Sequence, residues 1–156
     1  MSNLHASPRI TPFLWFDQNA EEAVEFYCSI FKNSRRITEL RNPGPAPGEP
    51  GSILTLGFEL DGVPFTALNG GPQYKFNPAV SFFIRCESQE EIDYYWARLT
   101  EGGGEVACGW LCDKFGLSWQ VVPANIRELV GNKKAMEAMM TMKKLDIAAL
   151  EQAGKS

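Results

Sequence analysis

The chain has 156 residues and only one histidine, His5, which lies close to the N-terminus. Zinc sites of the cysteine-histidine type need two ligand pairs, and no second pair accompanies Cys108 and Cys112. A nucleophile such as Ser81 or Cys108 also lacks a dependable histidine base. The sequence therefore predicts neither a cysteine-histidine zinc site nor a hydrolase triad, and it identifies no catalytic residue.

The sequence also lacks a long cluster of lysine and arginine residues. Lysine and arginine number 15 against 19 acidic residues, which gives a formal charge of −4, and the basic doublets are only Arg35-Arg36, Lys133-Lys134 and Lys143-Lys144. Neither nucleic acid nor an anionic membrane is expected as a partner. No run of about 18 apolar residues occurs, and residues 1–12 lack the order of a signal peptide. We expect a cytoplasmic protein.

Cysteine is sparse, with four residues that lie inside apolar segments rather than in a loop framework. In a reducing compartment this pattern is typical of small buried side chains or free thiols. The short spacing of Cys108-Gly-Trp-Leu-Cys112 leaves a redox pair or a metal-binding pair open as alternatives.

What the chain does have is a strand-turn-helix order near its N-terminus. Residues 10–16 are β-branched and aromatic, and residues 20–31 carry apolar side chains at helical spacing. Asn19, followed three residues later by Glu22, predicts an N-cap with a capping box.

Three further strands are predicted after this helix. Residues 36–41 form a short strand, and the proline- and glycine-rich residues 42–51 form a mobile surface loop. Asp61-Gly62 between the apolar stretches 52–60 and 63–69 is a strong signal for a β-hairpin. The predicted order of this region is therefore βαβββ.

A second stretch repeats this order, with a strand over 79–86, a helix over 89–100 and short strands within 105–122. At an offset of 69 residues the two helices match in caps and apolar positions: Asn19/Ser88, Glu22/Glu91, Phe26/Tyr95, Tyr27/Trp96 and Ile30/Leu99. The sequence predicts an α+β fold in which tandem βαβββ modules, residues 9–72 and 78–123, form a curved mixed sheet in one domain.

The remaining residues, 124–153, are predicted to be a C-terminal helical extension. A short helical stretch over 125–130 precedes a long helix over 133–152 with a methionine-rich apolar face. Such faces usually serve packing. The helix packs either on its own domain or on a second subunit.

Several stretches of unusual order and spacing span most of the chain. They are Ile10–Asp17, Asn19–Ala23 with Phe26-Tyr27, Leu68-Asn-Gly-Gly-Pro72, Ala79–Phe82, Cys108–Trp110, Asp113–Gln120 and Met142–Leu150. Together they resemble the PhnB-like family, whose members often carry the label 3-demethylubiquinone-9 3-methyltransferase. This family is a branch of the vicinal-oxygen-chelate superfamily of glyoxalases and bleomycin-resistance proteins.

The resemblance implies paired modules whose sheets enclose a cleft, usually completed as a homodimer. In metal-dependent relatives, four inward His or Glu side chains hold a divalent ion. Transferred by position, these sites fall near Pro12, at Phe65 or Thr66, within 79–81 and at Gln120, and none of these residues is His, Asp or Glu. Neutral oxygens carry too little charge to hold zinc, nickel or manganese. We therefore expect no metal and no cofactor.

The family label names methyl transfer, which usually employs S-adenosylmethionine on a glycine-rich strand-to-helix turn. Leu68-Asn-Gly-Gly-Pro72 follows a predicted strand but precedes no helix, so it is predicted to be a turn or a pocket rim. Glu59 and Asp113 are acid-base candidates, although charged side chains at such positions are usually solvated. Methyl transfer stays one alternative.

Strand alternation and the resemblance together predict a pocket. We expect its lining to be Pro12, Leu14, Phe16, Asn69, Ser81, Trp110 and Gln120, with Trp15 and Trp119 in the core. The alternative is that these side chains simply fill the interior.

Two functions are compatible with these features. The first is a metal-free protein that binds an aromatic or planar small molecule, comparable to the bleomycin-resistance members. The second is an enzyme on a small oxygenated metabolite, a lyase, an isomerase or the labelled methyltransferase, with Asn69 and Gln120 as neutral hydrogen-bond donors. The sequence does not identify the ligand.

Overall fold

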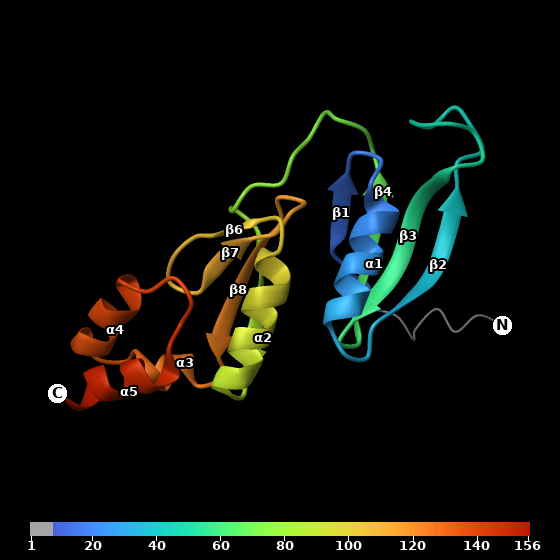
Figure 1. Ribbon diagram of the computed structural model, residues 1–156. Helices are drawn as coiled ribbons and strands as arrows, with labels where there is room; N and C mark the ends of the chain where they lie inside the picture. Colours follow the sequence, from blue (N-terminus) through green and yellow to red (C-terminus); the bar gives the residue numbers. More distant parts are fainter. Residues whose placement is uncertain (1–7) are drawn as a thin grey trace. The chain divides into compact units, whose positions relative to one another are not determined.

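The computed structural model describes residues 8–156, which divide into two compact units between Lys75 and Phe76. Each unit has its own four-stranded sheet. Figure 1 shows one helix lying along each sheet, and three further helices follow the second sheet.

The first unit consists of β1 (Phe13–Phe16), α1 (Ala20–Ile30), β2 (Arg35–Arg41), β3 (Ile53–Leu60) and β4 (Val63–Asn69). Its strands lie in the order β1-β4-β3-β2. The first and last strands of the unit are parallel neighbours, and the other neighbours are antiparallel. The predicted βαβββ order of this unit is confirmed.

Alternation along β1 gives the first sheet a buried and an open face. Leu14 and Phe16 are 6% and 3% exposed, whereas Phe13 of the same strand is 58% exposed. The buried face packs against α1, where Val24 and Tyr27 are fully buried. Burying a side chain of this kind stabilises the fold by about 1.5–3 kcal/mol.

The hairpin between β3 and β4 turns at Asp61 and Gly62, as predicted. Both residues have positive φ angles, 50° and 77°. Two consecutive left-handed residues give the tight turn whose twist suits antiparallel strands, and glycine adopts this backbone without steric cost.

The predicted loop over residues 42–51 lacks regular structure, and its backbone is organised around one buried side chain. Asn42 is 2% exposed, and its amide group donates to the carbonyls of Ala46, Pro47 and Gly48 at 2.9–3.2 Å. Its Oδ1 accepts from the Gly44 N–H at 2.7 Å. A short polar side chain thus replaces the missing strand or helix partners of the loop.

The capping box predicted at Asn19 and Glu22 is wrong, because the Asn19 side chain makes no capping hydrogen bond. The Ala20 N–H instead donates to Oδ1 of Asn69, at the end of β4, at 2.9 Å. The amide of Asn69 also donates to the carbonyl of Ile53 at 3.0 Å. A side chain distant in sequence therefore takes the place of the local cap.

The second unit repeats the topology with β5 (Ser81–Cys86), α2 (Gln89–Thr100), β6 (Gly104–Glu105), β7 (Trp110–Cys112) and β8 (Ser118–Pro123). Its strand order β5-β8-β7-β6 corresponds to that of the first sheet, again with parallel first and last strands. The predicted duplication is thereby confirmed. The N-cap predicted at Ser88 is also confirmed, because its hydroxyl accepts from the Glu91 N–H at 3.2 Å.

The C-terminal extension forms α3 (Ile126–Leu129), α4 (Lys133–Met140) and α5 (Ile147–Lys155). The single helix predicted over 133–152 is wrong. Asp146 begins a new helix because its carboxylate accepts from the Ala149 N–H at 3.0 Å. The residues between α4 and α5 are irregular, and the carbonyls of Met142 and Lys143 accept from the N–H groups of Cys108 and Gly109.

The extension packs on its own unit through a small apolar core. Val122, Leu145 and Leu150 are at most 4% exposed, and Met139 and Met142 lie against them. No helix in the described part of the chain has the length and hydropathy needed to cross a membrane.

Candidate functional site

Strand alternation also gives the second sheet two different faces. Leu111, Trp119 and Val121 form the face beneath α2 and are at most 3% exposed. The opposite face carries Phe83 and Gln120, with Phe83 49% exposed and Gln120 half-buried. We call this second surface the open face; it also includes Ser81, Arg85 and Trp110.

Gln120 lies at the middle of the open face. In the register of the sheet it pairs with Phe83 of β5 on one side and with Trp110 of β7 on the other. Its Nε2 donates to the hydroxyl of Ser81 at 3.0 Å. Two aromatic side chains therefore flank an amide whose orientation is fixed by a neighbouring hydroxyl.

Two polar atoms of this group have no partner within residues 8–156. They are the amide oxygen of Gln120, an acceptor, and the indole N–H of Trp110, a donor. Neither is a fully buried unsatisfied atom, so both keep contact with solvent. A polar molecule between the two aromatic rings would find one acceptor and one donor in place.

The corresponding face of the first sheet is more fully occupied. Phe13 pairs with Thr66 there as Phe83 pairs with Gln120 in the second sheet. Next to them Trp15, predicted to be core, is half-buried on this face, and its indole N–H donates to the Gly71 carbonyl at 2.9 Å. A Cβ at Gly70 would overlap this indole, so the Leu68–Pro72 turn serves to seat Trp15.

The structure brings together three of the seven residues predicted to line a pocket, namely Ser81, Trp110 and Gln120. Leu14 and Phe16 instead lie in the buried face under α1, and the buried Asn69 caps that helix. Pro12 is half-buried, and its carbonyl accepts from the Thr66 N–H at 3.0 Å.

The reason for this separation lies in the pairing of β1 with β4. The parallel register sets Leu14 beside Ala67 and Phe16 beside Asn69, all of which are buried. The sequence did contain one signal for the open face, because Thr66 is a polar residue between apolar neighbours in β4. Phe13, its register partner, is the exposed residue of β1.

Asp113 was expected to be solvated, and the structure shows it to be buried, with 2% exposure. Its Oδ1 accepts from the N–H groups of Phe115 and Leu117 at 2.8 and 3.0 Å, and its Oδ2 accepts from the Trp119 indole at 2.8 Å. The carboxylate thus holds the turn between β7 and β8. The other acid-base candidate, Glu59, pairs with Arg35 at 3.6 Å.

Cys108 and Cys112 have different neighbours. The thiol of Cys108 lies 3.7 Å from the Met140 sulfur, and the thiol of Cys112 lies 3.7 Å from the Asp113 carbonyl. Burial, and secondly the charge of Asp113, raises the pKa of Cys112. A raised pKa keeps this thiol protonated and unreactive.

The side chains of the described residues do not favour a metal-binding site. Residues 8–156 contain no group of three or more His, Cys, Asp or Glu side chains that could hold a metal ion. At the central register positions of the two open faces stand Thr66 and Gln120, which are neutral. This donor set does not fit a tightly held divalent ion.

Comparison with known proteins gives matches along most of the chain. Residues 8–122 match the model of a family described as 3-demethylubiquinone-9 3-methyltransferase. The solved PhnB protein from Bacillus cereus is 34% identical, with a TM-score of 0.67, over 74% of this chain and 99% of its own. None of the curated proteins is significantly similar.

More distant structures share the fold. Protein PA1353 from Pseudomonas aeruginosa is 21% identical, with a TM-score of 0.61, over 75% of this chain and 97% of its own. The fosfomycin resistance protein FosX from Listeria monocytogenes is 19% identical, with a TM-score of 0.53, over 80% of this chain and 98% of its own. These two structural similarities show only that the fold is shared.

Proposed function

This chain belongs to the PhnB-like family, described as 3-demethylubiquinone-9 3-methyltransferase, and from that membership we propose that it binds a small planar molecule on the open face of its second sheet. The observation that carries the proposal is the accessible acceptor and donor of Gln120 and Trp110 beside the exposed ring of Phe83. Clustered exposed aromatics on a small protein usually mark a binding surface.

The energetics of this group favour a ligand that is flat and carries polar atoms at its edge. Stacking on an aromatic ring contributes about 0.5–1.5 kcal/mol beyond area burial. Each hydrogen bond to Gln120 or Trp110 would add about 0.5–1.5 kcal/mol. The bond from Gln120 to Ser81 holds the amide in place before a ligand arrives, which reduces the entropy lost on binding.

We propose further that binding does not depend on a metal, because the central positions carry Thr66 and Gln120 rather than ionised ligands. Of the residues considered for a metal-free enzyme, Asn69 uses its amide oxygen to cap α1 and its amide nitrogen to bind the Ile53 carbonyl. The Nε2 donor of Gln120 is likewise bound to Ser81. These contacts favour a binding protein over an enzyme with neutral donors.

Methyl transfer, named in the family description, gains no support from the local backbone. The turn from β1 to α1 is Asp17-Gln18-Asn19, without glycine, and the glycines after β4 lie against Trp15. A glycine-rich turn at a helix N-terminus is the feature that usually cradles a nucleotide-like cofactor.

A homodimer is the proposed form of the protein. Phe13 and Phe83 occupy corresponding register positions and are 58% and 49% exposed. Apolar side chains so exposed are commonly covered by a partner. Sedimentation at micromolar concentration should show a dimer, and a single 17.4 kDa species would contradict the proposal.

The binding proposal is tested by Gln120→Leu, with Thr66→Val as the matched control in the first unit. Native mass spectrometry of the purified wild type should reveal a copurified small molecule. The Gln120→Leu variant should bind that molecule more weakly by about 1–3 kcal/mol and melt at the wild-type temperature. Thr66→Val should leave affinity unchanged. A large fall in melting temperature with no ligand found would show that Gln120 only serves packing.

A further inference from the structure

Beside Arg85 the open face continues into a concavity of about 710 Å³. It lies where β5 ends and where the chain passes from β8 into α3. Its lining consists of Phe83, Arg85, Ala124, Ile126, Arg127 and Glu128. Two arginines against one glutamate give the lining a net positive charge, in a chain whose formal charge is −4.

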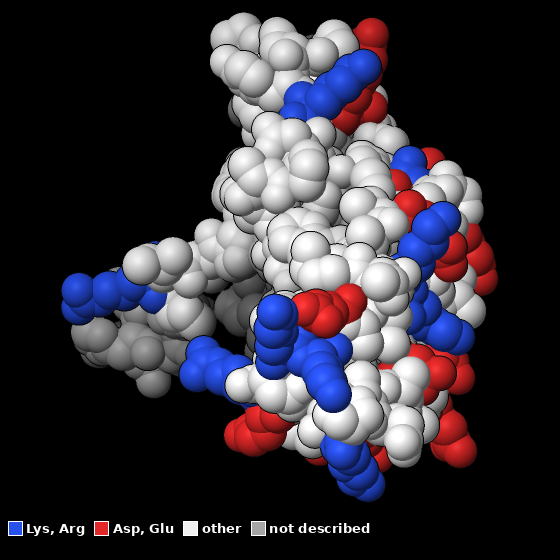
Figure 2. Space-filling model, turned by 90° about the vertical axis from the view of Figure 1, so that its left-hand side faces the viewer, with Lys and Arg blue, Asp and Glu red and all other residues white. Residues whose placement is uncertain are grey.

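The two arginines of this concavity differ from the other arginines between residues 35 and 127. Those others pair with glutamates: Arg35–Glu59, Arg36–Glu39, Arg41–Glu39 and Arg98–Glu101. Along the right-hand edge of the surface drawn in Figure 2, basic and acidic side chains are likewise interspersed. The guanidinium groups of Arg85 and Arg127 have no ion pair or side-chain hydrogen bond within residues 8–156, not even to Glu128.

The position of Arg85 relates the concavity to the aromatic group. Arg85 lies two residues beyond Phe83 on the same face of β5, so about 7 Å separates them along the strand. Gln120 is the register partner of Phe83. A molecule stacked on Phe83 would therefore extend one end to Arg85 and direct its other edge to Gln120.

The far wall of the concavity comes from the C-terminal extension. The family match ends at residue 122, and Ala124, Ile126, Arg127 and Glu128 all follow it. Ile126 is held in place by packing on the apolar core around Val122. The extension thus contributes one of the two guanidinium groups, on a support that is fixed to the sheet.

Resting on the proposed function, we propose that the concavity binds the carboxylate or phosphate group of the ligand, clamped between Arg85 and Arg127. Guanidinium groups recognise such oxyanions through paired N–H donors. The ligand class is accordingly a planar molecule bearing one acidic group, with its ring on Phe83 and its acid at the extension.

Benzoate and benzamide provide the test, because they share a shape and differ in charge. Calorimetric titration of the full chain should give at least about tenfold tighter binding of benzoate than of benzamide. In Arg85→Gln and in Arg127→Gln this preference should fall towards equality. Lys134→Gln, which removes an exposed positive charge on α4 outside the lining, should keep it. Phenyl phosphate in the same titrations determines which oxyanion is preferred.

The outcomes separate the two proposals. Equal binding of benzoate and benzamide by the wild type, or a preference that survives both arginine substitutions, would overturn the anion site and leave the aromatic site standing. Binding of neither aromatic probe at about 10 mM would overturn both. Melting temperatures of all variants should match that of the wild type, because Arg85 and Arg127 are exposed.

Discussion

The two βαβββ units share a strand order but differ in how the first turn of the helix is held. In the first unit Asn69, the register partner of Phe16, reaches from the end of β4 to the N–H of Ala20. In the second unit the corresponding partner of Cys86 is Pro123, whose side chain forms no hydrogen bond. There the local residue Ser88 provides the cap.

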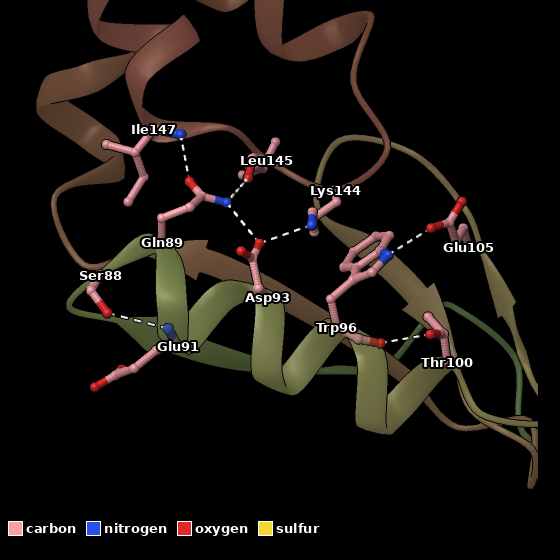
Figure 3. A network of polar contacts seen from close by, with 10 residues as sticks. All are labelled: Ser88, Gln89, Glu91, Asp93, Trp96, Thr100, Glu105, Lys144, Leu145 and Ile147. Atoms are coloured by element: carbon pink, nitrogen blue, oxygen red, sulfur yellow. Dashed lines mark hydrogen bonds and ion pairs between the residues drawn. The ribbon is translucent and has the colours of Figure 1, made fainter.

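Further along the helices, two buried apolar positions of α1 are polar in α2 and bind the C-terminal extension. Ala20 corresponds to Gln89, whose amide donates to the Leu145 carbonyl at 3.0 Å and accepts from the Ile147 N–H at 2.9 Å. Figure 3 shows these contacts together with the ion pair of Asp93 and Lys144 at 2.8 Å. The position of Asp93 is that of the buried Val24 in α1.

The duplicated module is therefore a scaffold whose helix face can serve two purposes. In the first unit the face closes over its own sheet. In the second unit part of the face binds residues 144–147 of the C-terminal extension, and residues 124–128 of the same extension line the proposed anion site. The following substitutions test whether the two units really depend on different contacts.

The largest expected difference concerns the turns before the last strand of each unit. Asp113→Ala should lower the free energy of unfolding by about 3–5 kcal/mol, because three donors lose their acceptor in a buried turn. Asp61→Ala in the first hairpin should cost only about 1 kcal/mol, the strain of alanine at positive φ. Urea unfolding followed by circular dichroism measures both.

Asp113→Asn is the control for this pair. It retains Oδ1 for the two backbone N–H groups but removes the second carboxylate oxygen, which accepts from the Trp119 indole. An intermediate loss is expected. If Asp61→Ala were as damaging as Asp113→Ala, the two turns would not differ in the way described.

A smaller difference is expected for the helix caps. Asn69→Ala should destabilise the first unit by about 2–3 kcal/mol, because it leaves a buried N–H and the Ile53 carbonyl unpaired. Ser88→Ala should cost about 1 kcal/mol, the usual loss for a local cap. The same unfolding experiment compares them, and the reverse ranking would contradict the long-range cap.

The smallest effect is pH-dependent and confined to the second unit. The hydrogen bond from Lys144, and secondly that from Gln89, lowers the pKa of Asp93 from its ordinary value of 3.8. Because the pKa of Asp93 is lower in the folded state, ionised Asp93 stabilises the fold at pH values above 3.8. This stabilisation is lost as the pH falls through the folded-state pKa. Because Asp93 is largely exposed, the effect is small.

Asp93→Asn isolates this contribution. Its melting temperature should fall less steeply than that of the wild type when the pH is lowered from about 5 to about 2. NMR titration of the Asp93 carboxyl measures the pKa itself. A midpoint at or above 3.8 would contradict the ion pair with Lys144.

Local signals in the sequence predicted the fold well. The bounds of α2 and β4 agree with the prediction to the residue, because Ser88 marks the helix start and Asp61-Gly62 marks the hairpin. The long C-terminal helix was wrong because Met142 and Leu145 continue the helical spacing. Asp146, a good N-cap residue, was the available signal for the break.

The candidate site was less predictable, because periodicity divides a strand into two faces without saying which face a helix covers. Leu14 and Phe16 were therefore expected in the pocket, and they lie in the core. The cap by Asn69 depends on a parallel pairing across most of the unit, which no local pattern reveals. Arg127 lies beside the open face because of the course that the C-terminal extension takes, and the sequence pattern does not predict that course.

The parallel pairing of first and last strands also bears on how the chain folds. Phe13 must find Thr66 before the first sheet is complete, whereas Ser81 has only to find Ser118, a shorter excursion along the chain. Loop closure costs more entropy for the longer segment, and contacts distant in sequence slow folding. The second sheet should therefore form first, and refolding followed by hydrogen exchange should protect the amides of β8 before those of β4.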